Sequence, residues 1–201
     1  MDEFDPRPSR RDLLRALTAA PVVAVVSPAS DALAVLHTQY EDQPATLART
    51  REGRSLSRFR YHNAESFLWG LNQGICGNDV GEMLYRSGIV VQLGLSSYLL
   101  DIGFSDEWNA RHIRLDVAKS LAYANATGFG HGCPDMARLA AVLSPYWKWG
   151  HAHRFEARPD DGGFTTSKVA PLLRTLLDHV HDVTGHRRPN GWRREQREVQ
   201  A

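Results

Sequence analysis

Apolar residues recur at helical spacing along the last two-thirds of the chain, and the segment from Ser167 to Thr184 has the clearest pattern. A stripe recurring every three or four residues predicts an amphipathic helix with one buried face. Gly185 follows the last periodic residue, where glycine commonly ends a helix. The inward positions expected for this helix are Val169, Leu172, Leu173, Leu176, Leu177, Val180 and Val183.

Two earlier segments show the same period. Ser105 is a favourable N-cap before a stripe containing Ile113, Val117 and Leu121, and Gly128 supplies the stop. Pro134 suits the first position of a further helix. The apolar stripe of that helix is expected to be Met136, Leu139, Ala140, Leu143 and Trp147.

The stretch from Asp79 to Ile102 leaves alternatives open. Asp79 and Glu82 have the spacing of a capping box, and apolar residues follow at helical spacing. Gly88 and Gly94 interrupt that pattern, so one helix, two helices or a local strand all remain compatible with it. The uncharged part is shorter than the roughly 20 apolar residues that a bilayer requires, which favours a buried element.

Together these patterns predict a mainly α fold, with a compact domain of about four to five helices over residues 60–186. Residues 35–59 form a polar connector in this division, although the arginine-rich residues 41–60 also fit a solvated helix. Residues 187–201 form a basic tail.

The N-terminal residues 9–15, Ser-Arg-Arg-Asp-Leu-Leu-Arg, resemble the twin-arginine export motif of bacteria, with Arg10 and Arg11 as the arginine pair. A short apolar run from Ala16 to Val26 follows, then small residues at 27–29 and 32–34 with cleavable spacing. The resemblance is to the leaders of small, uncharacterised proteobacterial proteins. It implies a leader over residues 1–34, the twin-arginine export machinery as partner, and a periplasmic or secreted product.

A second interpretation of the same residues needs no export. An amphipathic helix from Asp12 to Ala20, ending at Pro21 and followed by a short valine-rich strand, would belong to the fold itself. The protein would then be cytoplasmic.

Composition narrows the function classes. The formal net charge of the 201 residues is +1, so no global field attracts the chain to nucleic acid or to an anionic membrane. The two cysteines, Cys76 and Cys133, are too few for a disulfide scaffold, although one bridge could form in an oxidising compartment.

The glycine-rich residues 128–135 carry the first candidate chemistry. Cys133 would cap a helix beginning at Pro134, where the helix dipole favours a thiolate, and His131 lies two residues away as a candidate base. The competing interpretation is a plain turn between two helices. A Cys76–Cys133 disulfide would exclude the reactive thiol.

Metal binding is the second candidate chemistry, because the chain has nine histidines. His131 and Cys133 could join His151 and His153 to supply the nitrogen and sulfur ligands that zinc prefers. His179, His181 and His186 are a further set, although His179 and His181 would point to different faces of a helix. Ordinary surface histidines explain the same residues, and no cofactor can be assigned.

Two further segments have weaker functional interpretations. Residues 95–106 resemble the turn of AraC-type helix-turn-helix regulators, which would place Arg111 and Arg114 on a helix that enters the DNA groove. The aromatic run 145–155 could stack a ring, or it could close the core, with Trp147 buried and Trp149 half-exposed.

The sequence therefore favours an exported helical protein with a non-enzymatic binding or envelope-associated role. A cytosolic DNA-binding module and a metal- or thiol-dependent enzyme using His131 and Cys133 are the alternatives.

Overall fold

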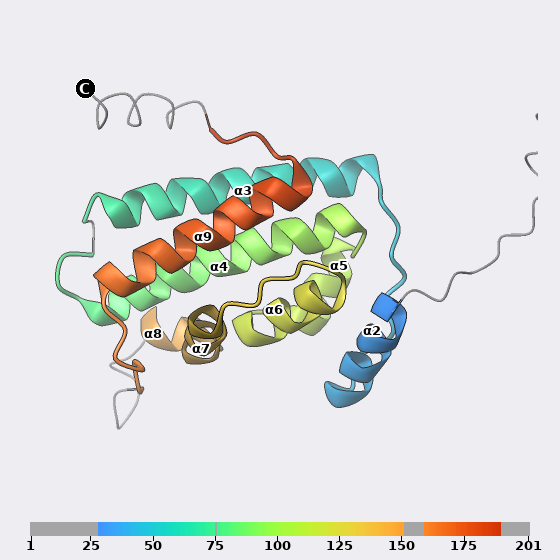
Figure 1. The fold of residues 1–201 in the computed structure, drawn as a ribbon, viewed down its shortest axis with the longest axis horizontal. Helices are drawn as coiled ribbons and strands as arrows, with labels where there is room; N and C mark the ends of the chain where they lie inside the picture. Colours follow the sequence, from blue (N-terminus) through green and yellow to red (C-terminus); the bar gives the residue numbers. More distant parts are fainter. Residues whose placement is uncertain (1–27, 75, 151–158, 190–201) are drawn as a thin grey trace, which may run out of the picture.

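The structure, a computed structural model, describes residues 28–74, 76–150 and 159–189 and confirms the mainly α fold class (Figure 1). Over these residues it contains no strand, and more helical segments than expected. These are α2 (Pro28–Gln39), α3 (Arg51–Asn72), α4 (Val80–Ile102), α5 (Asp106–Trp108), the π-helical turn η1 (Asn109–Ile113), α6 (Val117–Ala126), α7 (Pro134–Leu143), α8 (Trp147–Gly150) and α9 (Thr166–Thr184).

Helix α4 is the centre of the domain. Helices α3 and α9 run along it, while α6, α7 and α8 pack against it on the other side (Figure 1). Most of its side chains are buried, which explains the long uncharged stretch in the sequence. The largest enclosed side chains of the core include Tyr61, Tyr123, Phe104, Phe129, Leu68, Met83, Leu84, Leu95 and Leu99.

Gly88 and Gly94 do not break α4, and each allows a side chain of another element to approach the helix closely. A Cβ atom at Gly88 would lie 2.2 Å from the Cβ of Tyr146. A Cβ atom at Gly94 would lie 2.8 Å from the terminal Cδ2 of Leu177. The glycines therefore mark close approaches to α4 rather than helix ends.

Replacing Gly88 by alanine is expected to lower the free energy of unfolding by about 2 kcal/mol, since overpacking outweighs the better helix propensity of alanine. The clash is with an atom fixed to the backbone at Tyr146, so side-chain rotation cannot relieve it. Gly94→Ala is the matched control on the same helix, because the end of Leu177 can rotate away. Equal urea-unfolding midpoints for the two variants would contradict this account of Gly88.

Side-chain caps explain where two of the helices begin. The carboxylate of Asp79 accepts hydrogen bonds from the backbone N–H groups of Gly81 and Glu82, which confirms the predicted start of α4. The Glu82 carboxylate pairs with Arg86 one turn later. Ser105 caps α5 as predicted, by accepting from the N–H of Trp108.

The single helix predicted from Ser105 to Gly128 is wrong. The chain leaves η1 at Arg114, which has a positive φ of 54°. Asp116 then caps a new helix, α6, by accepting from the N–H of Lys119. Asp116 is a second good N-cap inside the periodic stretch, so a new helix can begin there. The spacing of the apolar residues gives no sign of this break.

The aromatic run closes the core, but the buried and the exposed tryptophan are the reverse of those predicted. Trp149 is 2% exposed and its indole N–H donates to the carbonyl of Val142, whereas Trp147 is 42% exposed. The reason is that α7 ends at Leu143, so Trp147 does not continue the stripe of that helix. Val183, predicted to face inward from α9, is also exposed.

A buried ion pair joins α3 to α9. Glu65 has a fully enclosed side chain and accepts two hydrogen bonds, both 2.7 Å long, from the guanidinium of Arg174. The hydroxyl of Tyr61 also donates to Glu65, at 2.6 Å. Burial and the contact with this carboxylate raise the pKa of Tyr61 above its ordinary value, so its hydroxyl stays a donor.

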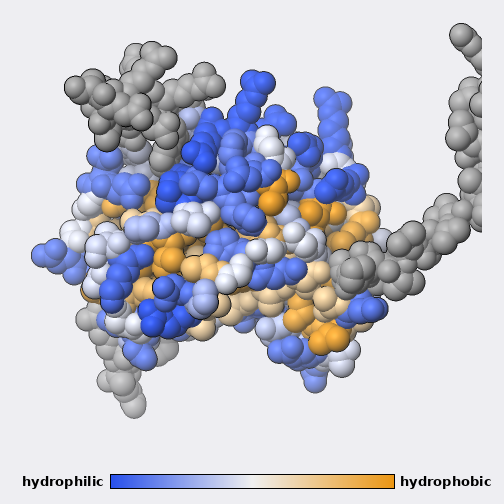
Figure 2. All heavy atoms as spheres, in the orientation of Figure 1, coloured by the Kyte–Doolittle hydropathy of each residue, from blue (hydrophilic) through white to orange (hydrophobic). Residues whose placement is uncertain are grey.

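The segment predicted as a connector divides into three parts. Its first residues belong to α2, which packs against α6, and residues 42–50 follow without helix. Helix α3 then begins at Arg51, capped by Thr50, so the second half of the arginine-rich stretch is helical. Figure 2 shows hydrophilic side chains gathered over α3.

The predicted leader lies mostly outside the described residues, including Arg10 and Arg11. Its end does not: Ala32, Leu33 and Ala34 lie within α2, and Leu33 is buried against the core. Within the described ranges, no helix has the length and apolarity needed to cross a bilayer.

Candidate functional site

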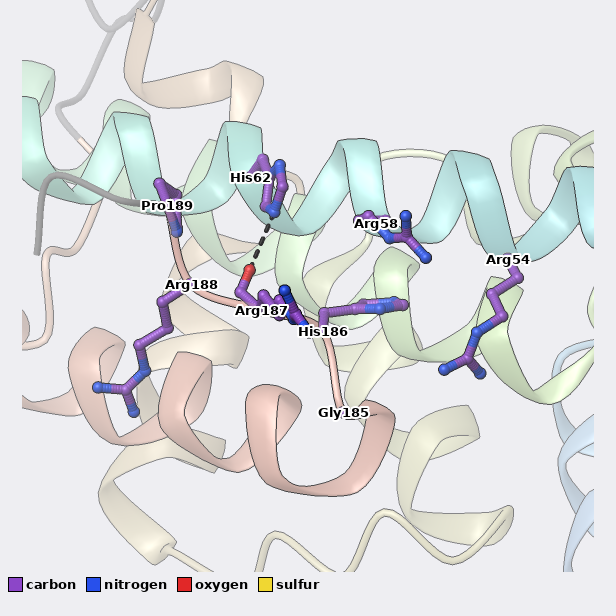
Figure 3. Close-up of a pocket in the computed structure, with 8 residues that line it drawn as sticks. All are labelled: Arg54, Arg58, His62, Gly185, His186, Arg187, Arg188 and Pro189. Atoms are coloured by element: carbon purple, nitrogen blue, oxygen red, sulfur yellow. Dashed lines mark hydrogen bonds between the residues drawn. The ribbon is translucent and has the colours of Figure 1, made fainter.

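A cleft of about 670 Å³ lies between α3 and the segment that follows α9 (Figure 3). Its walls are unusually rich in basic side chains. The lining residues are Arg54, Arg58, His62, Gly185, His186, Arg187, Arg188 and Pro189.

Helical spacing and one glycine turn build this cleft. Arg54, Arg58 and His62 follow one another at intervals of four residues, which places them along one side of α3. Gly185 ends α9 in the left-handed conformation, with φ of 67°, and the chain then runs back over α3. The Nε2 atom of His62 lies 2.9 Å from the carbonyl oxygen of Arg187, so this return segment is fastened to the helix (Figure 3).

Two of the arginines at the cleft are neutralised by carboxylates. Arg54 pairs with Asp101 at 3.0 Å and also donates to the carbonyl of Thr184. Arg188 pairs with Asp178 at 2.6 Å and points away from Arg54 and Arg58 in the close-up (Figure 3). These pairs hold the walls of the cleft together.

The remaining two arginines are different. Arg58 and Arg187 are exposed, and neither pairs with a carboxylate in the part of the chain that the structure describes. Among the described residues, the cleft therefore has two guanidinium groups without a carboxylate partner.

His186 lies between the walls and is almost completely buried. Burial lowers its pKa to about 4. The carboxylate of Asp101 opposes this shift, while the positive charges of Arg54 and Arg58 reinforce it. His186 is therefore neutral at pH 7, chiefly because it is buried.

Ser57 and His186 lie close together, but their geometry is not that of a nucleophile and its base. The Nε2 atom of His186 is 2.6 Å from the Ser57 hydroxyl, which is fully buried and donates to the carbonyl of Ser97 at 2.6 Å. Asp101 approaches the same Nε2 atom, at 3.9 Å, rather than the opposite nitrogen. The serine is a structural link between α3 and α4.

The structure places Cys133 at the N-cap of α7, as predicted, although its side chain makes no capping hydrogen bond. His131 is buried and stacks against Phe129, with the rings 5.9 Å apart. Both backbone polar groups of His131 bond to the side-chain amide of Asn125, which fixes the glycine-rich turn. Cys76 and Cys133 are both free thiols.

The histidines proposed as metal ligands are dispersed. His131 and His179 lie with ring centroids 5.6 Å apart, whereas His181 and His186 contact Tyr61. Within the described ranges, no three histidine, cysteine, aspartate or glutamate residues are grouped so as to hold a metal ion. The other two candidates, His151 and His153, lie outside those ranges.

Arg111 and Arg114 are exposed, but they do not lie on a long helix. Arg111 belongs to the five-residue turn η1, and Arg114 is the residue that ends it. Together with α5, this gives a short, bent segment in place of the continuous recognition helix that groove binding uses.

Sequence reasoning missed the cleft, although part of its signal was present. The basic residues Arg54, Arg58 and His62 have regular helical spacing, but Arg54 and Arg58 were assigned to a connector or a solvated helix and His62 to the helical domain. The other wall comes from residues 185–189, at the start of the basic tail, and its contact with His62 spans 125 residues of sequence, so only the folded chain brings the two together.

The chain matches no protein-family model, no curated protein and no solved structure.

Proposed function

We propose that this protein binds a small anionic ligand in the cleft between α3 and residues 185–189. The observation that carries the proposal is the pair of guanidinium groups, Arg58 and Arg187, on opposite walls of a cleft and without carboxylate partners among the described residues.

The chemistry of these walls favours an oxyanion such as a phosphate or a carboxylate. Guanidinium groups donate two parallel hydrogen bonds to such groups, and charge-assisted bonds of this kind are the strong ones in proteins. Neutral His186 and the paired Arg54 add polar surface without adding free charge. The volume of about 670 Å³ lies in the range that small-molecule sites occupy.

Inorganic pyrophosphate is the probe for this proposal, with isothermal titration calorimetry of the full chain as the measurement. The double variant Arg58→Ala/Arg187→Ala is expected to bind it at least about tenfold more weakly, since two charge-assisted contacts are lost. Arg111→Ala removes an exposed arginine far from the cleft in sequence, and it should leave the affinity unchanged. Equal affinity of the double variant and the unaltered chain would contradict the proposal.

We also propose that the protein acts outside the cytoplasm, after export through the twin-arginine pathway. Of the two small-residue segments at the end of the leader, residues 32–34 lie inside α2, where Leu33 contributes to the core. We therefore expect cleavage at residues 27–29, which would leave α2 nearly complete.

Mass spectrometry of the protein recovered from a bacterial host tests this expectation. The mature chain should begin just before or within the first turn of α2, and Arg10→Lys/Arg11→Lys should retain the full-length precursor in the cytoplasm. An intact N-terminus in the unaltered protein, or normal export of the lysine variant, would contradict it.

A further inference from the structure

A second polar cluster lies away from the basic cleft, around the carboxylate of Asp42. This carboxylate is nearly buried and accepts hydrogen bonds from three side chains. The Nζ atom of Lys119 lies 2.8 Å from its Oδ1, the Tyr123 hydroxyl 2.6 Å from its Oδ2, and the Nδ1 of His112 3.2 Å from its Oδ1.

These contacts keep Asp42 ionised. Burial by itself would raise the pKa of Asp42, but the hydrogen bonds and charge of Lys119, with the bonds from Tyr123 and His112, hold it below the ordinary value. A charged acceptor fixes the ring orientation and the proton of the histidine that it contacts.

His112 is held in the orientation of a base. With Nδ1–H donating to Asp42, the neutral ring keeps its lone pair on Nε2. Within the described ranges, that nitrogen has no hydrogen-bond partner. It is also absent from the fully buried side-chain atoms that lack a partner there. Trp108 packs against the ring with the centroids 4.8 Å apart. Nε2 is therefore not fully enclosed by the described residues, and it lies on a ring whose side chain is 12% exposed.

His112 lines a cleft of about 530 Å³. Lys119 lines the same cleft, and its Nζ atom contacts the same Asp42 oxygen, Oδ1, as Nδ1 of His112. The exposed side chains of Leu115 and Trp147 form an apolar part of the wall. An accessible imidazole, a cation and an apolar surface are the groups needed to hydrolyse a hydrophobic ester.

We propose that this cleft hydrolyses small hydrophobic carboxylic esters, with His112 as general base and Lys119 as the group that stabilises the oxyanion. Nε2 of His112 takes a proton from water while the water oxygen bonds to the ester carbonyl carbon. The carbonyl oxygen becomes an oxyanion beside Nζ of Lys119. When the carbonyl re-forms, the bond to the alcohol oxygen breaks, and that oxygen takes the proton from Nε2. The products are the acid and the alcohol.

Asp42 has a positioning role in this reaction, because it contacts His112 and Lys119 rather than the ester. The same contacts also stabilise the fold by joining residue 42 to η1 and α6. A test must therefore separate loss of catalysis from loss of structure.

The test is the hydrolysis of 4-nitrophenyl butyrate by the full chain, followed by release of nitrophenolate. His112→Gln is expected to lower the rate above background at least about tenfold, since general-base catalysis contributes factors of this size or larger. His37→Gln is the control, because His37 also contacts Trp108 and Tyr123 but does not line this cleft. It should hydrolyse the ester at the unaltered rate.

A second variant, His112→Ala, distinguishes a catalytic role of His112 from a purely structural one. Added imidazole should restore part of its activity, by occupying the space of the missing ring. Undiminished hydrolysis by His112→Gln would overturn the proposal. So would a folded His112→Ala variant, judged by its circular dichroism, that imidazole does not rescue.

Discussion

Replacing Glu65 by alanine is expected to lower the free energy of unfolding by about 4 kcal/mol. The substitution removes the fully buried carboxylate that binds Arg174, which then keeps Asp178, at 2.7 Å, as its carboxylate partner. Breaking a buried ion pair by removing one partner costs about 3–5 kcal/mol. It also removes the acceptor of the Tyr61 hydroxyl. Urea unfolding followed by circular dichroism measures the change.

Glu82→Ala provides the matched control, because Glu82 forms an ion pair of similar length with Arg86 but at the surface of α4. Exposed pairs contribute about 0–1 kcal/mol, so the control should unfold close to the unaltered protein. If both variants lost the same stability, burial would not be what distinguishes Glu65.

Acidification from pH 6.5 to pH 4 is expected to destabilise the protein by about 3 kcal/mol through His186 alone. The pKa of His186 is about 4 in the folded chain, against about 6.5 for an unfolded histidine, so the unfolded state binds the extra proton in this interval. The stabilisation is complete above pH 6.5 and is lost as the pH falls through 4. Thermal or urea unfolding across this range measures it.

His186→Gln isolates this contribution, because glutamine has an amide donor and does not titrate. Other groups, such as buried His131, whose pKa burial also lowers, act in the same direction in both proteins. The difference in stability between the variant and the unaltered chain should therefore shrink as the pH falls. A constant difference from pH 7 to pH 4 would contradict the buried neutral state of His186.

The helices and their ends were largely predictable from the sequence. Local interactions determine them: the apolar stripe of α9, the stop at Gly185, and the caps Asp79 and Ser105 all act within a few residues. The Gly88 position was ambiguous because its explanation is Tyr146, nearly 60 residues later. The restart at Asp116 was missed because two adjacent caps compete within one periodic stretch.

The candidate sites were much less predictable. The basic cleft joins α3 to the segment after α9, and the Asp42 cluster joins a non-helical loop to η1 and α6. Single-sequence patterns report spacing along one element, and they contain no information on which elements meet. His131 and Cys133 in the glycine-rich turn were predicted as candidates because they are close in sequence. Asp42 was assigned to a polar connector and was not predicted as a site residue.

The first and last long helices of the domain are connected by polar contacts along much of their length. Arg54 donates to the carbonyl at the end of α9, and His62 contacts the backbone just beyond it. Glu65 binds Arg174, nearly three turns before that end. Fraying of the C-terminal helix would therefore have to disrupt contacts made by α3 as well. The two helices consequently form one cooperative unit, in which the C-terminal helix does not open first and alone.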